Sequence, residues 1–107
     1  MALVRICGTA EVPPGEAKRF ELGERLVAVV NLGDEGFRAL DAICSHAHYF
    51  LDEGEVDLDI ETIECPKHGS TFDLNSGKPR TLPAIQPVEA FATTVENDDV
   101  MIEVQGR

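Results

Sequence analysis

Two short blocks, Cys44-Ser45-His46 and Cys65-Pro66-Lys67-His68, contain four side chains that bind transition metals. The blocks read C-x-H and C-x-x-H, and eighteen residues separate them. Each block supplies one thiolate and one imidazole, and four such ligands in two short loops are typical of a metal site. The predicted metal ligands are therefore Cys44, His46, Cys65 and His68.

The mixed composition of each block favours a binuclear cluster over a single metal ion. A mononuclear zinc site usually pairs two cysteines within one block, as C-x₂-C. Here one iron can take the two cysteines, one from each block, and the other iron can take the two histidines. A Rieske [2Fe–2S] centre has this ligand set, because two histidines replace two cysteines on one of its irons. A structural zinc site is the alternative.

The two blocks, extended to Cys65-Pro66-Lys67-His68-Gly69-Ser70, resemble the cluster-binding loops of the Rieske family. The small size of the chain and the absence of further cysteines from the blocks resemble one branch of it. This branch holds the Rieske-type [2Fe–2S] ferredoxins, the ferredoxin components of bacterial aromatic-ring-hydroxylating dioxygenase systems. The resemblance covers nearly the whole chain. The eighteen-residue spacer is slightly longer than the family usually shows, which we interpret as a surface insertion.

The resemblance implies a one-electron carrier with one [2Fe–2S] cluster per chain. It would pass electrons from an NAD(P)H-dependent ferredoxin reductase to a terminal oxygenase in aromatic hydrocarbon catabolism, and it would not itself be an enzyme. An oxygenase also needs a mononuclear iron site and a large substrate domain, for which 107 residues and three histidines leave no room. The alternative function is a structural zinc-binding interaction module.

Acidic residues dominate the charge of the chain, which is −11 from 20 acidic and 9 basic residues. Such a charge repels nucleic acid and anionic membranes, and it favours a basic protein partner. Seven acidic and no basic residues occupy residues 52–64, either as a solvated surface or as a docking patch. We expect docking through the cluster tip and this acidic surface, and a monomeric carrier.

The sequence also bears on the compartment. No stretch is apolar over the ~20 residues that a transmembrane helix needs, and the first residues do not resemble a signal peptide. Two of the three cysteines are assigned to the cluster, and the third, Cys7, is predicted to be a small buried side chain. These features favour a cytoplasmic protein.

Hydrophobic alternation and frequent turns predict an all-β fold, a Rieske-like antiparallel β-sandwich or barrel of about nine strands. In the first strand we expect Val4 and Ile6 on one face and Cys7 on the other. Gly33-Asp34-Glu35-Gly36 is predicted to be a hairpin turn. The expected strands span residues 3–7, 18–22, 25–32, 37–43, 60–64, 71–73, 88–95 and 100–104, with strand-like alternation also before residue 60.

A chain of this length forms a single domain, residues 1–107. Because the predicted ligands lie on two loops between strands, we expect a small cluster-binding subdomain of about residues 43–83. The base would comprise about residues 1–42 and 84–107. The resemblance also implies that a loop over residues 81–87 covers the cluster, with Pro83 in the lid.

The resemblance further implies a low reduction potential. High-potential Rieske proteins have a disulfide between the two loops and a tyrosine that donates a hydrogen bond to the cluster, but Lys67 and Phe72 stand at the matching positions here. Ser70, at the position of a second donor, is present. We therefore expect a potential nearer about −150 mV than about +300 mV.

Overall fold

The structure is a computed structural model that describes residues 2–44, 49–66, 69–81 and 86–104. In these residues the chain forms ten strands and three short 3₁₀ turns. The strands are β1 (Ala2–Gly8), β2 (Ala17–Leu22), β3 (Arg25–Asn31), β4 (Phe37–Asp41), β5 (Val56–Asp57), β6 (Thr62–Glu64), β7 (Thr71–Asp73), β8 (Ala90–Phe91), β9 (Thr93–Glu96) and β10 (Asp99–Val104). The 3₁₀ turns are η1 (Thr9–Glu11), η2 (Gly33–Glu35) and η3 (Leu51–Glu53). The predicted all-β fold class is confirmed, and the described part contains no helix that could span a membrane.

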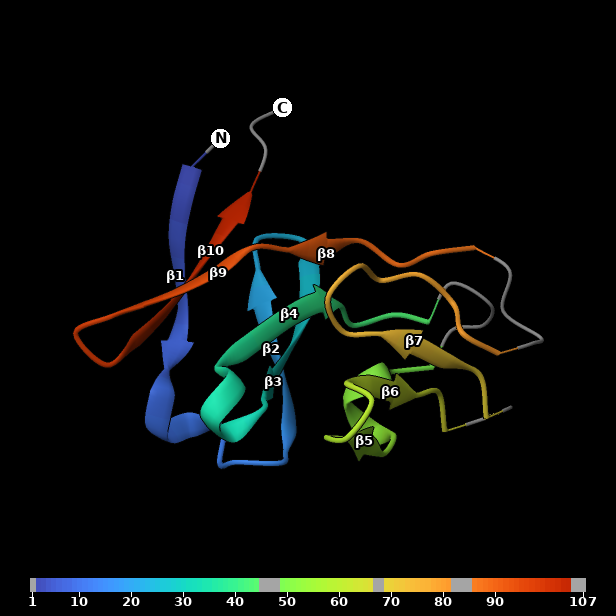
Figure 1. Cartoon of the computed structure of the whole chain (residues 1–107). Coiled ribbons are helices and arrows are strands. Elements are labelled where there is room, and N and C mark those ends of the chain that lie inside the picture. Colours follow the sequence, from blue (N-terminus) through green and yellow to red (C-terminus); the bar gives the residue numbers. More distant parts are fainter. Residues whose placement is uncertain (1, 45–48, 67–68, 82–85, 105–107) are drawn as a thin grey trace.

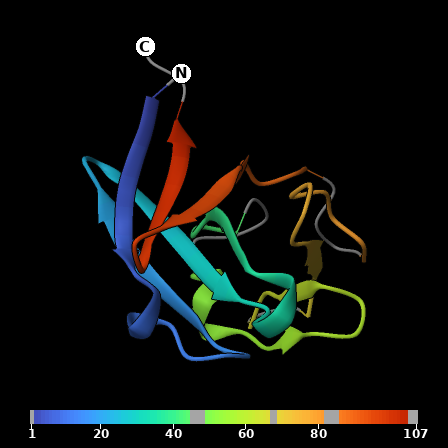
Figure 2. The same ribbon diagram turned by 60° about the vertical axis from the view of Figure 1, so that its left-hand side comes forward.

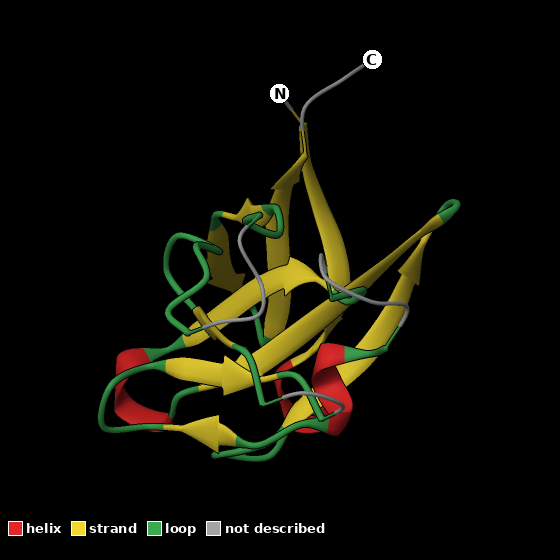
Figure 3. Cartoon of the chain, turned by 90° about the vertical axis from the view of Figure 1, so that its right-hand side faces the viewer, coloured by secondary structure: helices red, strands yellow, loops and turns green. Residues whose placement is uncertain are grey.

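The strands form three antiparallel sheets, in the orders β1-β10-β9, β2-β3-β4-β8 and β5-β6-β7. The first sheet contains both the first and the last strand, and the small third sheet lies to one side of the other two (Figures 1 and 2). Figure 3 shows how little of the chain is helical between these sheets. All three strands of the small sheet come from residues 56–73, within the range expected for a cluster-binding subdomain.

Strand β3 lies between two hydrophobic clusters, because it is buried on both faces. Val27 and Val29 belong to a base cluster, and Val30 belongs to a second cluster that we call the site cluster. The base cluster comprises Ile6, Cys7, Val12, Val27, Val29, Ala39, Phe91, Val100 and Ile102. The site cluster comprises Val30, Leu32, Leu40, Cys44, Leu51, Ile63, Cys65, Phe72, Leu74 and Val88. The strand expected over residues 25–32 is confirmed as β3, and its valines lie in both clusters.

The connection between β3 and β4 follows the sequence prediction. Gly33 and Gly36 adopt positive φ angles of 71° and 86°, which side-chain-bearing residues rarely adopt. The backbone N–H of Gly36 donates to Gly33, and that of Leu32 donates to Gly36. The hairpin turn is therefore confirmed, with a single 3₁₀ turn, η2, at its tip.

The predicted alternation in the first strand is wrong at one point. The pairing of β1 with β10 shifts register between Arg5 and Cys7, which marks a β-bulge or similar irregularity. Ile6 and Cys7, expected on opposite faces, are therefore both buried, with 8% and 1% of their surface exposed. Cys7 is the buried small side chain that the sequence predicts.

Two further strands are shorter than expected. Residues 58–61 form a turn and β6 begins at Thr62, so the expected strand over 60–64 loses its first half. The strand expected over 88–95 is divided at Ala92. There the chain leaves the sheet of β4, to which β8 belongs, and enters the sheet of β10, to which β9 belongs. Hydrophobic alternation alone does not reveal such a change of sheet.

Cys7 is expected to resist thiol reagents in the folded protein. Burial, and secondarily the charge of Glu11, raises the pKa of Cys7 to about 11. At pH 8 only about one thiol in a thousand would be the reactive thiolate. Peptide mapping after brief iodoacetamide treatment should find Cys7 unlabelled in native protein and labelled in denaturant. Rapid labelling under native conditions would contradict the buried position.

Candidate metal centre

Cys44 stands at the start of a loop whose base is closed by backbone contacts. It follows β4, and its backbone N–H donates to the carbonyl of Tyr49 at 2.9 Å. The next residues outward, Ile43 and Phe50, form an antiparallel bridge. Leu51 then donates its N–H to the carbonyl of Ala42 at 2.7 Å. The position of Cys44 is thus fixed by β4, which precedes it, and by residues 49–51, which bond back to residues 42–44.

Cys65 stands at the start of a second loop that is closed in the same way. It follows β6, and its backbone N–H donates to the carbonyl of Ser70 at 2.6 Å, just before β7. Gly69 donates its N–H back to the carbonyl of Cys65 at 3.1 Å, with a positive φ of 74°. In each loop the backbone N–H of the cysteine therefore donates to the backbone carbonyl of the residue five positions later, which is Tyr49 in one loop and Ser70 in the other.

The two cysteines belong to the same site cluster, with 3% of Cys44 and none of Cys65 exposed. Neither forms a disulfide. The two thiols lie in apolar surroundings, and backbone hydrogen bonds fix the loops that carry them. Such a pair of thiols fits thiolate coordination of iron or zinc. The donor set in the described residues thus fits the cysteine half of an iron–sulfur site.

The histidine half of the predicted site lies outside the described residues, as do Lys67, His48 and Pro83. Among the residues that the structure describes, no group of three or more histidine, cysteine, aspartate or glutamate side chains could hold a metal ion. The structure therefore brings together the two predicted cysteines and leaves His46 and His68 as sequence predictions.

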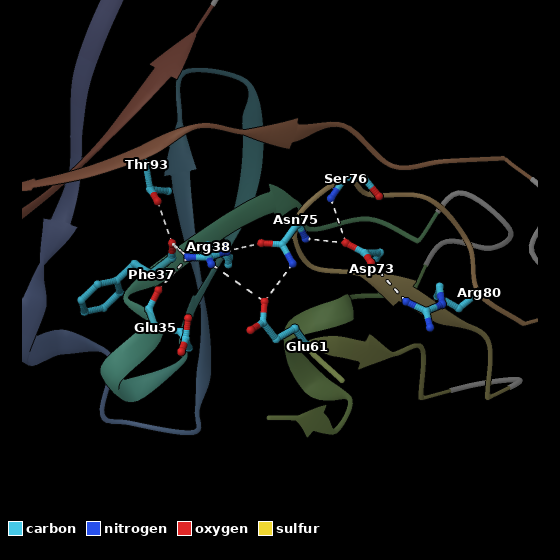
Figure 4. A network of polar contacts seen from close by, with 9 residues as sticks. All are labelled: Glu35, Phe37, Arg38, Glu61, Asp73, Asn75, Ser76, Arg80 and Thr93. Atoms are coloured by element: carbon cyan, nitrogen blue, oxygen red, sulfur yellow. Dashed lines mark hydrogen bonds and ion pairs between the residues drawn. The ribbon is translucent and has the colours of Figure 1, made fainter. Parts of the chain in front are cut away.

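A polar network that the sequence analysis missed connects the small sheet to the base (Figure 4). Arg38 of β4 donates from Nε to the side-chain oxygen of Asn75 at 2.6 Å, and Asn75 donates from Nδ2 to Glu61 Oε1 at 2.8 Å. The Nη1 atom of Arg38 also donates to the carbonyls of Glu35 and Phe37, both at 3.0 Å. The only sequence signal was that Arg38 alternates with apolar residues in its strand.

A second group of contacts joins the end of β7 to the segment that follows it. Asp73 Oδ1 accepts from the backbone N–H groups of Asn75 and Ser76, and Oδ2 lies 3.2 Å from Arg80 Nη1. Burial raises the pKa of Asp73, but these donors outweigh it, so the pKa is lower than usual. Thr81 accepts from the N–H of Thr71 at 2.8 Å. The segment that enters the expected lid is therefore tied to β7.

Arg19 of β2 connects the base to residues 50–53, which follow the first loop. Its guanidinium lies 3.6 Å from the centre of the Phe50 ring. The Nη1 atom is 3.8 Å from Asp52 Oδ1 and 3.7 Å from Glu53 Oε2. The Asp52 side chain is only 11% exposed, and its Oδ1 has no hydrogen-bond partner, since 3.8 Å is too long for one. The result is a buried carboxylate with an incomplete shell of donors.

Replacing Asp52 by asparagine is expected to stabilise the protein at neutral pH. Burial raises the pKa of Asp52 above its ordinary 3.8, although Arg19 opposes this. The folded state therefore binds a proton at Asp52 more readily than the unfolded state does. The protonated Asp52 contributes to the free energy of unfolding at low pH, and this contribution is lost as pH rises from 3.8 through the higher pKa of the folded state. The free energy of unfolding of Asp52→Asn should be about 1 kcal/mol higher than that of the parent at pH 7, and the difference should shrink as pH falls through that range.

Denaturant unfolding between pH 4 and pH 7 measures this effect. Glu53→Gln is the matched control, because Glu53 faces the same Arg19 but its side chain is 57% exposed. The free energy of unfolding of Glu53→Gln should stay within about 0.5 kcal/mol of that of the parent. An Asp52→Asn protein that is less stable than the parent at pH 7 would show that attraction to Arg19 outweighs the cost of burial.

The sequence is similar to those of known proteins. The model of the family "Rieske [2Fe-2S] domain" matches residues 2–92. The chain is 40% identical over 106 residues to the ferredoxin component of biphenyl 2,3-dioxygenase from Rhodococcus jostii (strain RHA1), covering 99% of this chain and 96% of that protein.

Two solved structures are also similar. The ferredoxin of carbazole 1,9a-dioxygenase from Nocardioides aromaticivorans IC177 superposes with a TM-score of 0.90 at 30% identity, covering 98% of this chain and 100% of that one. A chain in the complex of reduced oxygenase and oxidized ferredoxin in carbazole 1,9a-dioxygenase has a TM-score of 0.83 at 31% identity, covering 94% and 91%. The protein therefore belongs to the Rieske [2Fe-2S] domain family and is a ferredoxin with a Rieske-type [2Fe–2S] cluster.

Proposed function

We propose that the cluster is held by Cys44 and Cys65 on one iron and by His46 and His68 on the other. The observation that supports this is the matched placement of the two cysteines. Each is buried in the site cluster, and each begins a loop closed by its own backbone N–H. The histidines follow the cysteines by two and three positions, so the same loops would carry all four ligands.

The chain would be divided in a way that is consistent with this assignment. We propose a cluster-binding subdomain of about residues 43–83 on a base made of about residues 1–42 and 84–107. The network of Arg38, Asn75 and Glu61 would fix the subdomain on the base, and Arg19 would hold the return of the first loop. Such a frame limits movement of the ligands when the charge of the site changes, which favours fast electron transfer.

The protein is an electron carrier and not itself an enzyme, since its relatives are ferredoxin components. When bound, a Rieske [2Fe–2S] cluster accepts and releases one electron at a time. We propose that the carrier serves an aromatic-ring-hydroxylating dioxygenase system and delivers its electrons to the terminal oxygenase. The related ferredoxin in complex with an oxygenase supports this partner. We further propose an NAD(P)H-dependent ferredoxin reductase as electron source and the cytoplasm as compartment, because the three cysteines form no disulfide in the described structure, which is compatible with reducing conditions.

The test is metal analysis, visible absorption and electron paramagnetic resonance of purified protein reduced with dithionite. Two irons and two sulfides per chain, with an average g below that of all-cysteine [2Fe–2S] proteins, would support two-histidine ligation. A colourless protein with stoichiometric zinc would instead support the structural zinc module. Reduction by NADH with a reductase, followed by reoxidation on adding an oxygenase, tests the carrier role separately.

A further inference from the structure

The hairpin of β5 and β6, residues 55–64, is called the acidic hairpin here, and its turn has a fixed conformation. Asp57 Oδ1 accepts from the backbone N–H of Asp59 at 2.9 Å and of Ile60 at 3.3 Å. At the other end of the turn, the Glu61 carboxylate accepts from Asn75 Nδ2 at 2.8 Å. Glu61 itself has a positive φ of 54°. The turn is therefore held from both sides.

This fixed turn exposes two large apolar side chains. Leu58 is 48% exposed and Ile60 is 55% exposed. They line an open hollow of about 500 Å³, together with Val56 of β5. The hollow reaches Glu64 and Thr71, which pair across β6 and β7. The apolar side chains whose alternation suggested a strand thus form an apolar surface beside the second cysteine loop.

Among the residues that the structure describes, the charged side chains that line this hollow are all acidic. They are Glu55, Asp57, Asp59 and Glu64. None of these four takes part in an ion pair within the described part of the chain. An apolar centre with a charged rim is the arrangement found at protein–protein interfaces. The uncompensated acids indicate a partner whose rim is basic.

We propose that the acidic hairpin is a docking surface for the terminal oxygenase, through an oxygenase surface with an apolar centre and a rim of lysine or arginine. This inference rests on the proposed carrier function. A second copy of this chain would bring acid against acid, and nucleic acid or an anionic membrane would be repelled as well. The oxygenase is the partner with which a related ferredoxin has been solved.

The hairpin is close enough to the second loop for one partner to cover both. Cys65 is five positions after Ile60, which is at most roughly 17 Å along an extended strand. A standard interface buries about 800 Å² per partner and is therefore roughly 30 Å across. Because the hollow itself extends from Leu58 and Ile60 to Glu64 and Thr71, an oxygenase seated on it would also reach the start of the loop that Cys65 begins.

The experiment uses the reduced holoprotein and the oxygenase of the R. jostii biphenyl dioxygenase, mixed in a stopped-flow instrument. For Leu58→Ser/Ile60→Ser, the oxygenase concentration at half-maximal rate should rise about tenfold. The maximal rate and the reduction potential should not change, because the cluster is untouched. The matched control is Leu3→Ser/Val95→Ser, which removes side chains of 44% and 48% exposure from the base. It should stay within about twofold of the parent.

A second pair of substitutions tests the charged rim without altering the apolar residues. Glu55→Gln/Asp59→Asn retains the Asp57 contacts that hold the turn, and it should flatten the salt dependence of the bimolecular rate. Unchanged concentration and salt dependence in both hairpin variants would overturn the docking proposal alone. A parent protein that no ferredoxin reductase reduces, and that never reduces the oxygenase, would overturn the carrier function, and the docking proposal with it.

Discussion

Replacing Cys65 by serine is expected to abolish the cluster. Cys65 is fully buried in the site cluster, and its backbone is held from both sides by Ser70 and Gly69. A serine hydroxyl at this position is a harder and far less acidic donor than a thiol, so it cannot replace a thiolate on iron. Protein purified from cells should contain less than about a tenth of the parent's iron and should lack visible absorption.

The matched control for this variant is Cys7→Ala. Cys7 is equally buried, but it lies in the base cluster and has no predicted role in coordination. This protein should retain full iron content and an unchanged electron paramagnetic resonance spectrum. A Cys65→Ser protein that keeps its cluster, or a Cys7→Ala protein that loses it, would show that the cysteine assignment is wrong.

Replacing Gly54 by alanine is expected to prevent the first loop and the small sheet from packing together. A β-carbon at Gly54 would lie 1.5 Å from the carbonyl oxygen and 2.7 Å from the carbonyl carbon of Glu64. Both are backbone atoms of β6, next to Cys65, and they cannot rotate away. The backbone of Gly54 or of Glu64 would have to move, and this should lower the free energy of unfolding by more than about 4 kcal/mol. The melting temperature should then fall by at least about 15 °C.

Thermal unfolding followed by circular dichroism measures this loss. The control is Gly8→Ala, since a β-carbon at Gly8 finds its nearest neighbour at 3.4 Å, and its φ of −85° suits alanine. The melting temperature of this control should stay within a few degrees of the parent. If Gly54→Ala melted no lower than Gly8→Ala, the close approach of η3 to β6 would be wrong.

Local signals were sufficient for much of the fold. The glycines of the β3–β4 connection are needed for positive φ angles, and the valine run of β3 leads to a strand buried on both faces. The two cysteine blocks were sufficient to predict the family, because few other sites combine thiolate and imidazole in each of two loops. These features depend on residues that are neighbours in the sequence.

Features that depend on distant contacts were not predictable in this way. Residues 56–60 alternate like a strand, yet Asp57 and Glu61 make contacts that turn the chain and leave Leu58 and Ile60 exposed. Similarly, the connection from Arg38 to Asn75 joins residues 37 positions apart. No pattern along the chain reports it, because its partners meet only after the sheets have formed.

The pairing of the first strand with the last has a consequence for synthesis on the ribosome. Ala2 pairs with Val104 and Gly8 with Asp99, so β1 has no sheet partner in the described chain until residues 99–104 have been made. The β2-β3-β4 meander needs only near neighbours and can form much earlier. A nascent chain arrested before residue 99 would therefore leave β1 as an unpaired strand, prone to aggregation until β10 emerges.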